Sequence, residues 1–327
     1  MIVPEAVRIA ALGMALALAV PSALAAETWP SRPVRIVIPY SPGGSTDTLG
    51  RLAAQKLGDA FGQQFVPDNR TGGGGIIGSE MVARAAPDGY TFVISSLPTI
   101  VIGPILNAAN WNFDPLKDYT HVALLGETPS VLVTDTRLPA TTLAEFIAVA
   151  KSTAGGLSYG TAGIGSSGHI FGEMLQLRTG IRMTHVPYRG ANQAVADLMG
   201  HQLPVGFLTL QTAAEQIGAG AVRALAVTTR RRLPTQPDLP TFLELGYPDL
   251  AASTWFALAA PAGLPPEIVQ KVNAAIVKGF QEPDVRSRLE RDGIEFEPFG
   301  PAEFNAFVHA EYDRWAPVVR TLAAKAN

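Results

Sequence analysis

Short apolar runs alternate with amphipathic stretches along most of the chain, and this alternation predicts strands and helices in turn. The first apolar run, Val34–Ile38, reads as a buried strand that ends at Pro39, and residues 48–61 carry apolar side chains at helical spacing. The same patterns predict a strand at 65–66, a helix at 77–85 and a strand at 90–95. Strands alternating with helices indicate an α/β fold with a largely parallel sheet.

The alternation restarts in the middle of the chain. It predicts strands at 131–133, 157–159, 183–186, 204–208 and 224–228, with helices at 143–152, 168–179 and 191–199. A strand at 255–259, a helix at 266–281 and an amphipathic helix from Pro301 follow. Because the C-terminal helices need a sheet to cover, we expect one domain built from both ends of the chain, 26–131 and 229–327. The second domain is expected at 132–228, with crossovers near Val131 and Thr228.

The N-terminus predicts export. Residues 9–20 are almost continuously apolar, and Ala23 and Ala25 supply the small residues of an A-x-A cleavage site. The run is too short to span a bilayer, so we expect a signal peptide at 1–25, cleaved near Ala25, and a periplasmic protein. The alternative is a buried N-terminal helix.

Composition narrows the function classes. The chain has 327 residues, 47% hydrophobic and 16% charged, with a net charge of −3, which is sufficient for two domains with real cores. The charged residues form no basic stripe, so nucleic acid is not expected as a partner. The absence of cysteine excludes disulfides, Cys-ligated zinc and thiol catalysis.

The stretch GIGSSG, residues 163–168, has the spacing of a dinucleotide-binding loop. That interpretation needs an acid about 20 residues on, and the region around Arg189 has none, although Arg189 itself suits a 2′-phosphate. A hydrolase elbow fails because His169 stands where glycine is required. A metal site of His169 and Glu173 lacks a third ligand. We therefore expect no catalytic residue, no metal and no cofactor.

The same loop suits an anion. Glycines expose backbone N–H groups, Ser166 and Ser167 add hydroxyls, and a helix predicted from Gly168 directs its positive dipole end there. The loop 41–47, SPGGSTD, repeats this design, with Asp47 or Thr46 as the expected cap. Either loop alone is as readily a simple turn and cap, but together they predict two domains facing one cleft. A small carboxylate fits better than a phosphate, because neither loop contains Lys or Arg.

Seven sequence blocks carry a family resemblance. They are PYSPGGSTDTLGR (39–51), NRTGGGGIIG (69–78), APDGYTF (86–92), DPLKDY (114–119), YGTAGIGSSGH (159–169), VPYRGANQAVADLMG (186–200) and RALAVTT (223–229). In this order they resemble the Bug solute receptors of tripartite tricarboxylate transporters. The resemblance implies a two-domain type II periplasmic binding protein fold, each domain a mixed sheet flanked by helices. It also implies a hinge and an interdomain cleft for small carboxylic acids.

The resemblance implies ligand contacts from both loops. The first loop supplies Tyr40, Gly43, Gly44, Ser45, Thr46 and Asp47, and the second supplies Thr161, Gly165, Ser166, Ser167 and His169. Ser95 or Ser96 is expected to join them. Asp47 reads more readily as a cap, since a carboxylate would repel an acidic solute, and a neutral, structural His169 stays an equal alternative.

The chain departs from the family pattern after the helix at 191–199. Pro204 and Leu208 stand where the family usually has acids, and Thr209 stands where it has asparagine. If position 208 lines the cleft, no acid there can hold an ammonium group. We therefore expect a carboxylate without an amino group, with an apolar or aromatic body against Leu208, Phe207 or Tyr188. The alternative is that position 208 is simply buried.

The sequence thus predicts a monomeric binding protein, not an enzyme, that captures a small dicarboxylate or aromatic acid. Membrane subunits of a tripartite tricarboxylate system are the expected partners. Two alternatives stay open: a ligand sensor that signals through a membrane partner, and a dinucleotide-dependent enzyme.

Overall fold

The computed structural model describes residues 29–106 and 108–326. The signal peptide predicted at 1–25 lies outside this range. Among the described residues, no helix combines the length and apolarity needed to cross a membrane.

Nine strands form one continuous sheet of order β2-β1-β3-β9-β4-β7-β5-β6, with β8 paired to β4. Their bounds are β1 Val34–Ile38, β2 Phe65–Asn69, β3 Thr91–Ser96, β4 Tyr119–Asp135, β5 Leu157–Thr161, β6 Met183–Pro187, β7 Val205–Thr209, β8 Val222–Val227 and β9 Ser253–Pro261. Pairs within β1–β3 and within β5–β7 are parallel, whereas β4 and β9 run antiparallel to their neighbours. The fold is therefore α/β with a mixed sheet, as the resemblance implied. The largely parallel sheet predicted from the alternation is wrong, because β4 and β9 pair antiparallel with their neighbours.

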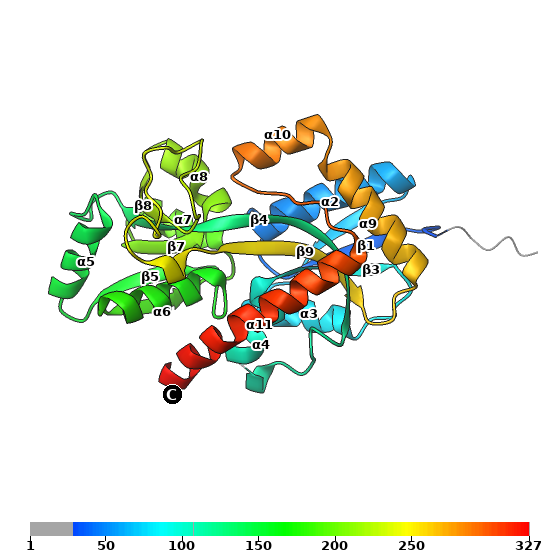
Figure 1. Ribbon diagram of the computed structural model, residues 1–327, viewed down its shortest axis with the longest axis horizontal. Helices are drawn as coiled ribbons and strands as arrows, with labels where there is room; N and C mark the ends of the chain where they lie inside the picture. The colour runs from blue at the N-terminus through cyan, green and yellow to red at the C-terminus, as the bar shows by residue number, and fades with distance from the viewer. Residues whose placement is uncertain (1–28, 107, 327) are drawn as a thin grey trace, which may run out of the picture.

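Two long strands join the two lobes of the molecule. β4 pairs with β9 over Tyr119 to Pro129 and then with β7 and β8 from Ser130 to Asp135. Figure 1 shows both strands running along the middle of the molecule, with β1–β3 at one end and β5–β8 at the other. The sequence predicted only 131–133 of β4, because Gly126, Glu127 and Pro129 interrupt its apolar run. Gly126 follows a register shift in β4, and Glu127 and Pro129 continue to pair with β9, so these residues do not end the strand.

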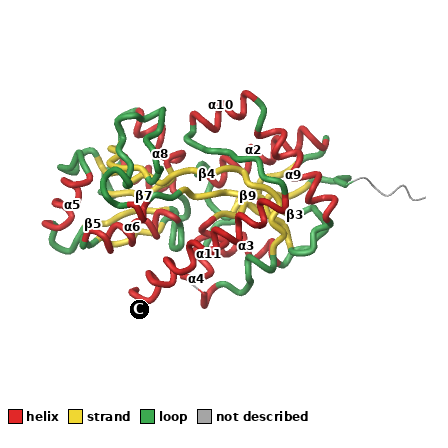
Figure 2. Tube along the Cα trace, viewed as in Figure 1, coloured by secondary structure: helices red, strands yellow, loops and turns green. Residues whose placement is uncertain are grey.

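Helices cover both faces of the sheet (Figure 2). They are α2 Ser45–Phe61, α3 Ile76–Ala83, α4 Gly103–Leu106, α5 Leu143–Ser152, α6 Ser167–Thr179, α7 Ala191–Met199, α8 Leu210–Gly218, α9 Pro266–Phe280, α10 Pro283–Arg291 and α11 Pro301–Ala326. A π-helical turn, Pro98–Ile102, precedes α4. The sequence did not predict α8 or α10: α8 is a short amphipathic helix that begins directly after β7, and α10 is mostly charged.

Three apolar clusters hold the helices on the sheet. One packs α2 and α9 on the β1–β3 end around residues such as Leu49 and Val272, and one packs α7 and α8 on the β5–β8 end. The third runs through both ends and includes Phe171 of α6 and Trp315 of α11. The packing leaves the first turns of several helices directed toward the boundary between the lobes.

Candidate functional site

A cavity lies between the lobes where both predicted loops meet. Its volume is about 50 Å³. A narrow cavity of this kind fits a small solute rather than a dinucleotide.

Many predicted site residues line this cavity, namely Tyr40, Gly44, Ser45, Thr46, Ser96, Ser166, Ser167, Leu208 and Thr209. Gly43, Asp47, Ser95, Thr161, Gly165, His169 and Tyr188 do not line it. The lining residues absent from the predicted set are Ser41, Pro98, Ala162, Gly168, Gly190, Ala191, Phe207, Thr254 and Phe256. Phe207 appeared beforehand only as a possible apolar contact.

Helix N-termini supply the electrostatics of the cavity. The N-cap residues of α2, α6, α7 and α8 are Gly44, Ser166, Gly190 and Thr209, and all four line it. Within the described chain, no side chain caps α2, α7 or α8, and no lining residue is charged. Helix starts without a side-chain cap, together with their positive dipole ends, favour an anion. The sequence predicted anion-binding helix starts at α2 and α6. It did not predict them at α7 and α8, because no serine-rich loop precedes those helices.

The first loop differs locally from its prediction. Helix α2 begins at Ser45 rather than Thr48, with Gly44 as N-cap, so Asp47 is inside the first turn. The Asp47 carboxylate accepts hydrogen bonds from Gly43 N at 3.0 Å, Arg51 Nε at 2.9 Å and Asn69 Nδ2 at 2.9 Å. Burial acts to raise the Asp47 pKa, but these hydrogen bonds and the Arg51 charge outweigh it and lower the pKa. Asp47 therefore holds the loop in shape as an anion directed away from the cavity.

The second loop places two serines with different roles. Ser166 is the N-cap of α6, and its Oγ accepts a hydrogen bond from His169 N at 3.3 Å. Ser167 begins the helix, one residue before the predicted start. Its side chain is buried, its Oγ has no hydrogen-bond partner in the part of the chain described, and it lines the cavity. Ser167 is thus a polar group prepared for an additional partner.

His169 is engaged inside the second lobe. Its Nδ1 accepts a hydrogen bond from Gly165 N at 3.2 Å, and its ring stacks on His185 with centroids 4.1 Å apart. Burial lowers the pKa of His169, so the ring is neutral. His185 in turn bonds Thr161 Oγ1 at 2.7 Å. His169 and Thr161 therefore support the loop from the side away from the cavity. No group of three His, Cys, Asp or Glu side chains that could hold a metal ion occurs within residues 29–106 and 108–326.

The remaining predicted residues lie at the margin. The Tyr40 hydroxyl donates to Gly74 O at 3.0 Å, and burial raises the Tyr40 pKa. The Tyr188 hydroxyl donates to Asp197 at 2.6 Å; burial and this contact raise its pKa to about 12. Tyr188 borders a neighbouring cavity formed with Gly74 and Ile164 rather than the main one. Ser95 Oγ donates to Ala257 O at 3.5 Å inside the sheet.

Direct contacts hold the two lobes together across the cavity. Ser45 Oγ lies 2.8 Å from Thr209 Oγ1, and Asn192 Nδ2 donates to Pro42 O at 2.7 Å. At the rim, a Cβ atom added to Gly74 would lie 2.2 Å from Ile164 O. The lobes are therefore in close contact on both sides of the site.

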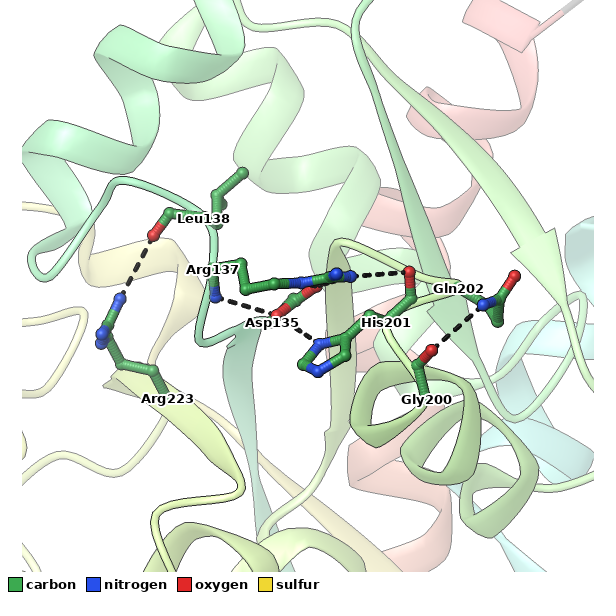
Figure 3. A network of polar contacts seen from close by, with 7 residues as sticks. All are labelled: Asp135, Arg137, Leu138, Gly200, His201, Gln202 and Arg223. Atoms are coloured by element: carbon green, nitrogen blue, oxygen red, sulfur yellow. Dashed lines mark hydrogen bonds and ion pairs between the residues drawn. The ribbon is translucent and has the colours of Figure 1, made fainter.

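The stretch after α7, where the sequence departs from the family pattern, lies in a separate polar network (Figure 3). His201 has a left-handed φ of 59°, and its Nδ1 lies 2.9 Å from Asp135 Oδ1. Arg137 donates to the Asp135 carboxylate and to His201 O. None of the residues in this network lines the cavity. Asp135 thus holds His201 at a turn position that favours glycine. Of the residues that depart from the family pattern, Leu208 and Thr209 line the cavity.

Known proteins resemble this chain over nearly its whole length. Protein BugT of Bordetella pertussis is 35% identical over 318 residues, covering 97% of this chain and 98% of that protein. A solved structure titled R. palustris Rpa4515 with adipate has a TM-score of 0.86 at 34% identity, covering 90% and 98% of the two chains. MatC from Rhodopseudomonas palustris with bound malate has a TM-score of 0.84 at 33% identity, covering 89% and 100%.

The family model described as tripartite tricarboxylate transporter family receptor matches residues 49–323. This range contains most of the fold and the second loop. The match confirms the family expected from the seven sequence blocks and excludes the enzyme alternatives, since the family is a class of solute-binding receptors. The chain belongs to the tripartite tricarboxylate transporter receptor family and is a periplasmic solute-binding receptor of the Bug type.

Proposed function

We propose that the cavity captures a small organic carboxylate, a dicarboxylate or an aromatic acid without an amino group. The observation that carries this proposal is Ser167 Oγ at the N-terminus of α6, which is buried and has no partner among the described residues, in a cavity whose described lining is uncharged. Backbone N–H groups and hydroxyls stabilise a carboxylate while leaving no fixed positive charge to retain it. That arrangement suits reversible capture and release.

The ligands of two relatives support the chemical class. Of the two R. palustris structures, one is with adipate and the other is with bound malate. Both are dicarboxylates without an amino group.

The apolar part of the cavity supports the predicted body of the ligand. Phe207, Leu208, Phe256 and Pro98 line it alongside the hydroxyl groups. Leu208 is 2% exposed and still borders the cavity, so the two interpretations of position 208 are compatible. We assign the ligand-binding role to the predicted residues that line the cavity, and a supporting role to Asp47, Thr161, Gly165 and His169.

Closure is the expected means of holding the acid. We propose a hinge where β4 and β9 cross between the lobes, close to the expected crossovers near Val131 and Thr228, with the two lobes closing on the ligand. Because residues 239–242 pack against β7 and β8, we propose that the second domain continues past 228 to the start of β9. Contacts such as Ser45 to Thr209 form across the closed cleft and favour the liganded state if the ligand adds interactions to both lobes. The closed monomer then delivers the acid to the membrane subunits of a tripartite transporter.

A thermal-shift screen against mono-, di- and tricarboxylates and aromatic acids tests this function, followed by calorimetry on the acids that raise Tm. We expect saturable binding of at least one carboxylate lacking an amino group. Binding restricted to amino acids, sugars or cations would contradict the proposal.

A further inference from the structure

Thr254 contributes a buried hydroxyl to the cavity from a strand rather than from a loop. It lies on β9, one of the two strands that cross between the lobes, and its side chain is 1% exposed. Its Oγ1 has no hydrogen-bond partner among residues 29–106 and 108–326, and the residue lines the cavity. Burying a hydroxyl without a partner costs free energy, and native proteins contain few such groups.

The neighbours of Thr254 do not satisfy this hydroxyl. Its cross-strand partner on β4 is Thr128, whose own hydroxyl donates to Pro129 O at 3.5 Å. Along β9, Thr254 and Phe256 both line the cavity, whereas Trp255 between them packs against Phe307 on the other side of the strand. The alternation of the strand therefore directs Thr254 to the cavity.

The position of Thr254 differs from that of the carboxylate anchors. Ser45 and Ser167 lie in the first turns of α2 and α6, where dipole ends and N–H groups reinforce their hydroxyls. Thr254 has no helix N-terminus of its own and shares the cavity with apolar Phe256 and Leu208. A lone hydroxyl on a strand suits one neutral hydrogen bond or one oxygen of a second polar group.

We propose that Thr254 is a specificity-determining residue that hydrogen-bonds a second polar group of the captured acid. This inference rests on the proposed function and deepens it: the preferred ligand has two polar ends, as in a dicarboxylate or a hydroxy acid. A plain monocarboxylate of the same carbon chain leaves the Thr254 hydroxyl unpaired. A site built to hydrogen-bond a ligand group discriminates against analogues that lack it.

The test compares matched acids on matched variants by calorimetry. The acid pairs are succinate with butyrate and adipate with hexanoate. The variant Thr254→Val keeps the shape and removes the hydroxyl. Thr134→Val is the control, because Thr134 Oγ1 is equally buried and unpaired within the described chain but does not line the cavity.

The expected result is a loss of selectivity. Wild type prefers the diacid of at least one pair, and Thr254→Val weakens that diacid by about 10-fold while leaving the monoacid unchanged. Thr134→Val changes neither affinity. Thr254→Ser, which retains the hydroxyl, keeps the preference that Thr254→Ala loses; this second comparison serves if the valine variant does not fold.

Two results would overturn the inference alone. One is a wild type that binds monoacids as tightly as their diacids; the other is a Thr254→Val effect equal for both members of a pair. In both cases carboxylate binding itself persists, so the proposed function survives. If no carboxylate binds the folded wild type, the proposed function and this inference both fail.

Discussion

At the residue scale, the cavity combines side chains that are already satisfied with two that have no partner in the described chain. Ser45 and Thr209 bond each other across the lobes, and Ser166 caps its helix. Ser167 Oγ, at a helix start, and Thr254 Oγ1, on a strand, are both buried and unpaired within residues 29–106 and 108–326. A ligand oxygen therefore gains a hydrogen bond at Ser167 without breaking one inside the protein.

Ser167→Ala is expected to weaken carboxylate binding by about 1–3 kcal/mol, roughly 5- to 150-fold, because a hydrogen bond to a charged group is lost. Ser166→Ala should show a comparable loss, together with lower stability from the missing cap. Calorimetry measures the affinities and thermal unfolding measures the stabilities. The control is Ser79→Ala, which removes a buried, unpaired hydroxyl on α3 away from the cavity. Equal affinities for Ser167→Ala and wild type would contradict the assignment.

The absence of an acid at position 208 predicts discrimination against amino acids. An ammonium group in this cavity would lose its hydration, meet no anionic side chain among the described lining residues, and face positive helix ends. Succinate should therefore bind at least about 10-fold more tightly than aspartate, a difference of about 1.4 kcal/mol. Competitive calorimetry with the two acids measures it. Preferential binding of aspartate would show that an ammonium site exists elsewhere in the cleft.

At the element scale, the sequence predicted the main parts of the site and missed others for identifiable reasons. The glycine- and serine-rich loops before α2 and α6 were recognisable because their residues expose N–H groups at helix starts. The first turns of α7 and α8 were not, since Gly190 and Thr209 are ordinary cap residues in any helix. Thr254 was missed because a threonine inside an apolar strand carries no local signal. The cap predicted at Asp47 was wrong, and its actual contact with Asn69 could not be predicted because the two residues are distant in sequence.

Alanine substitutions in the glycine-rich turn before α3 should affect closure of the two lobes differently. Gly74 and Gly73 have similar left-handed φ values of 68° and 60°, so alanine strains both alike. A Cβ on Gly74 would lie 2.2 Å from Ile164 O of the other lobe, whereas one on Gly73 meets only the Ile76 side chain, 3.3 Å away. Gly74→Ala should therefore weaken binding about 10-fold or more relative to Gly73→Ala, because its Cβ would clash with the Ile164 carbonyl oxygen in the closed form.

Calorimetry gives the two affinities, and small-angle scattering of the acid-saturated variants gives their compactness. Gly74→Ala should stay more expanded than Gly73→Ala at saturating acid. Identical affinities and identical scattering would indicate that this rim contact has no part in closure.

At the scale of the whole molecule, the order of elements and the α/β class followed from periodicity, but the length of β4 did not. Its interior holds Gly126, Glu127 and Pro129, which in a sequence resemble a turn but in the fold pair with β9 just before β4 passes to β7 and β8. The two-domain architecture therefore came from the resemblance and from counting which helices lacked a sheet. The meeting of four helix starts at one cavity depends on tertiary packing and became visible only in the structure.

Buried histidines predict that the molecule loses stability in acid. Burial lowers the pKa of His121 to about 4 and that of His185 to about 3, with smaller contributions from neighbouring histidines, and burial also lowers that of His169. The unfolded chain binds these protons near pH 6.5, so stability is present above that pH and is lost as pH falls toward 4. Glu127 acts oppositely, because burial and nearby glutamates raise its pKa to about 7. The three histidines outweigh it, so the free energy of unfolding should fall on acidification.

Denaturant unfolding at pH 7.5, 6, 5 and 4 measures this dependence. His121→Leu should remove up to about 3 kcal/mol of the fall, because His121 is buried and neither ring nitrogen has a partner in the described chain. An unchanged pH profile in that variant would contradict a buried neutral His121.

A crystal structure grown with the acid that binds most tightly in calorimetry shows directly whether the helix starts at the cavity hold the ligand. We expect a carboxylate within hydrogen-bond distance of Ser167 Oγ, between the first turns of α2 and α6, with both lobes contacting the acid. A carboxylate bound outside this cavity, or held by a Lys or Arg side chain, would contradict it.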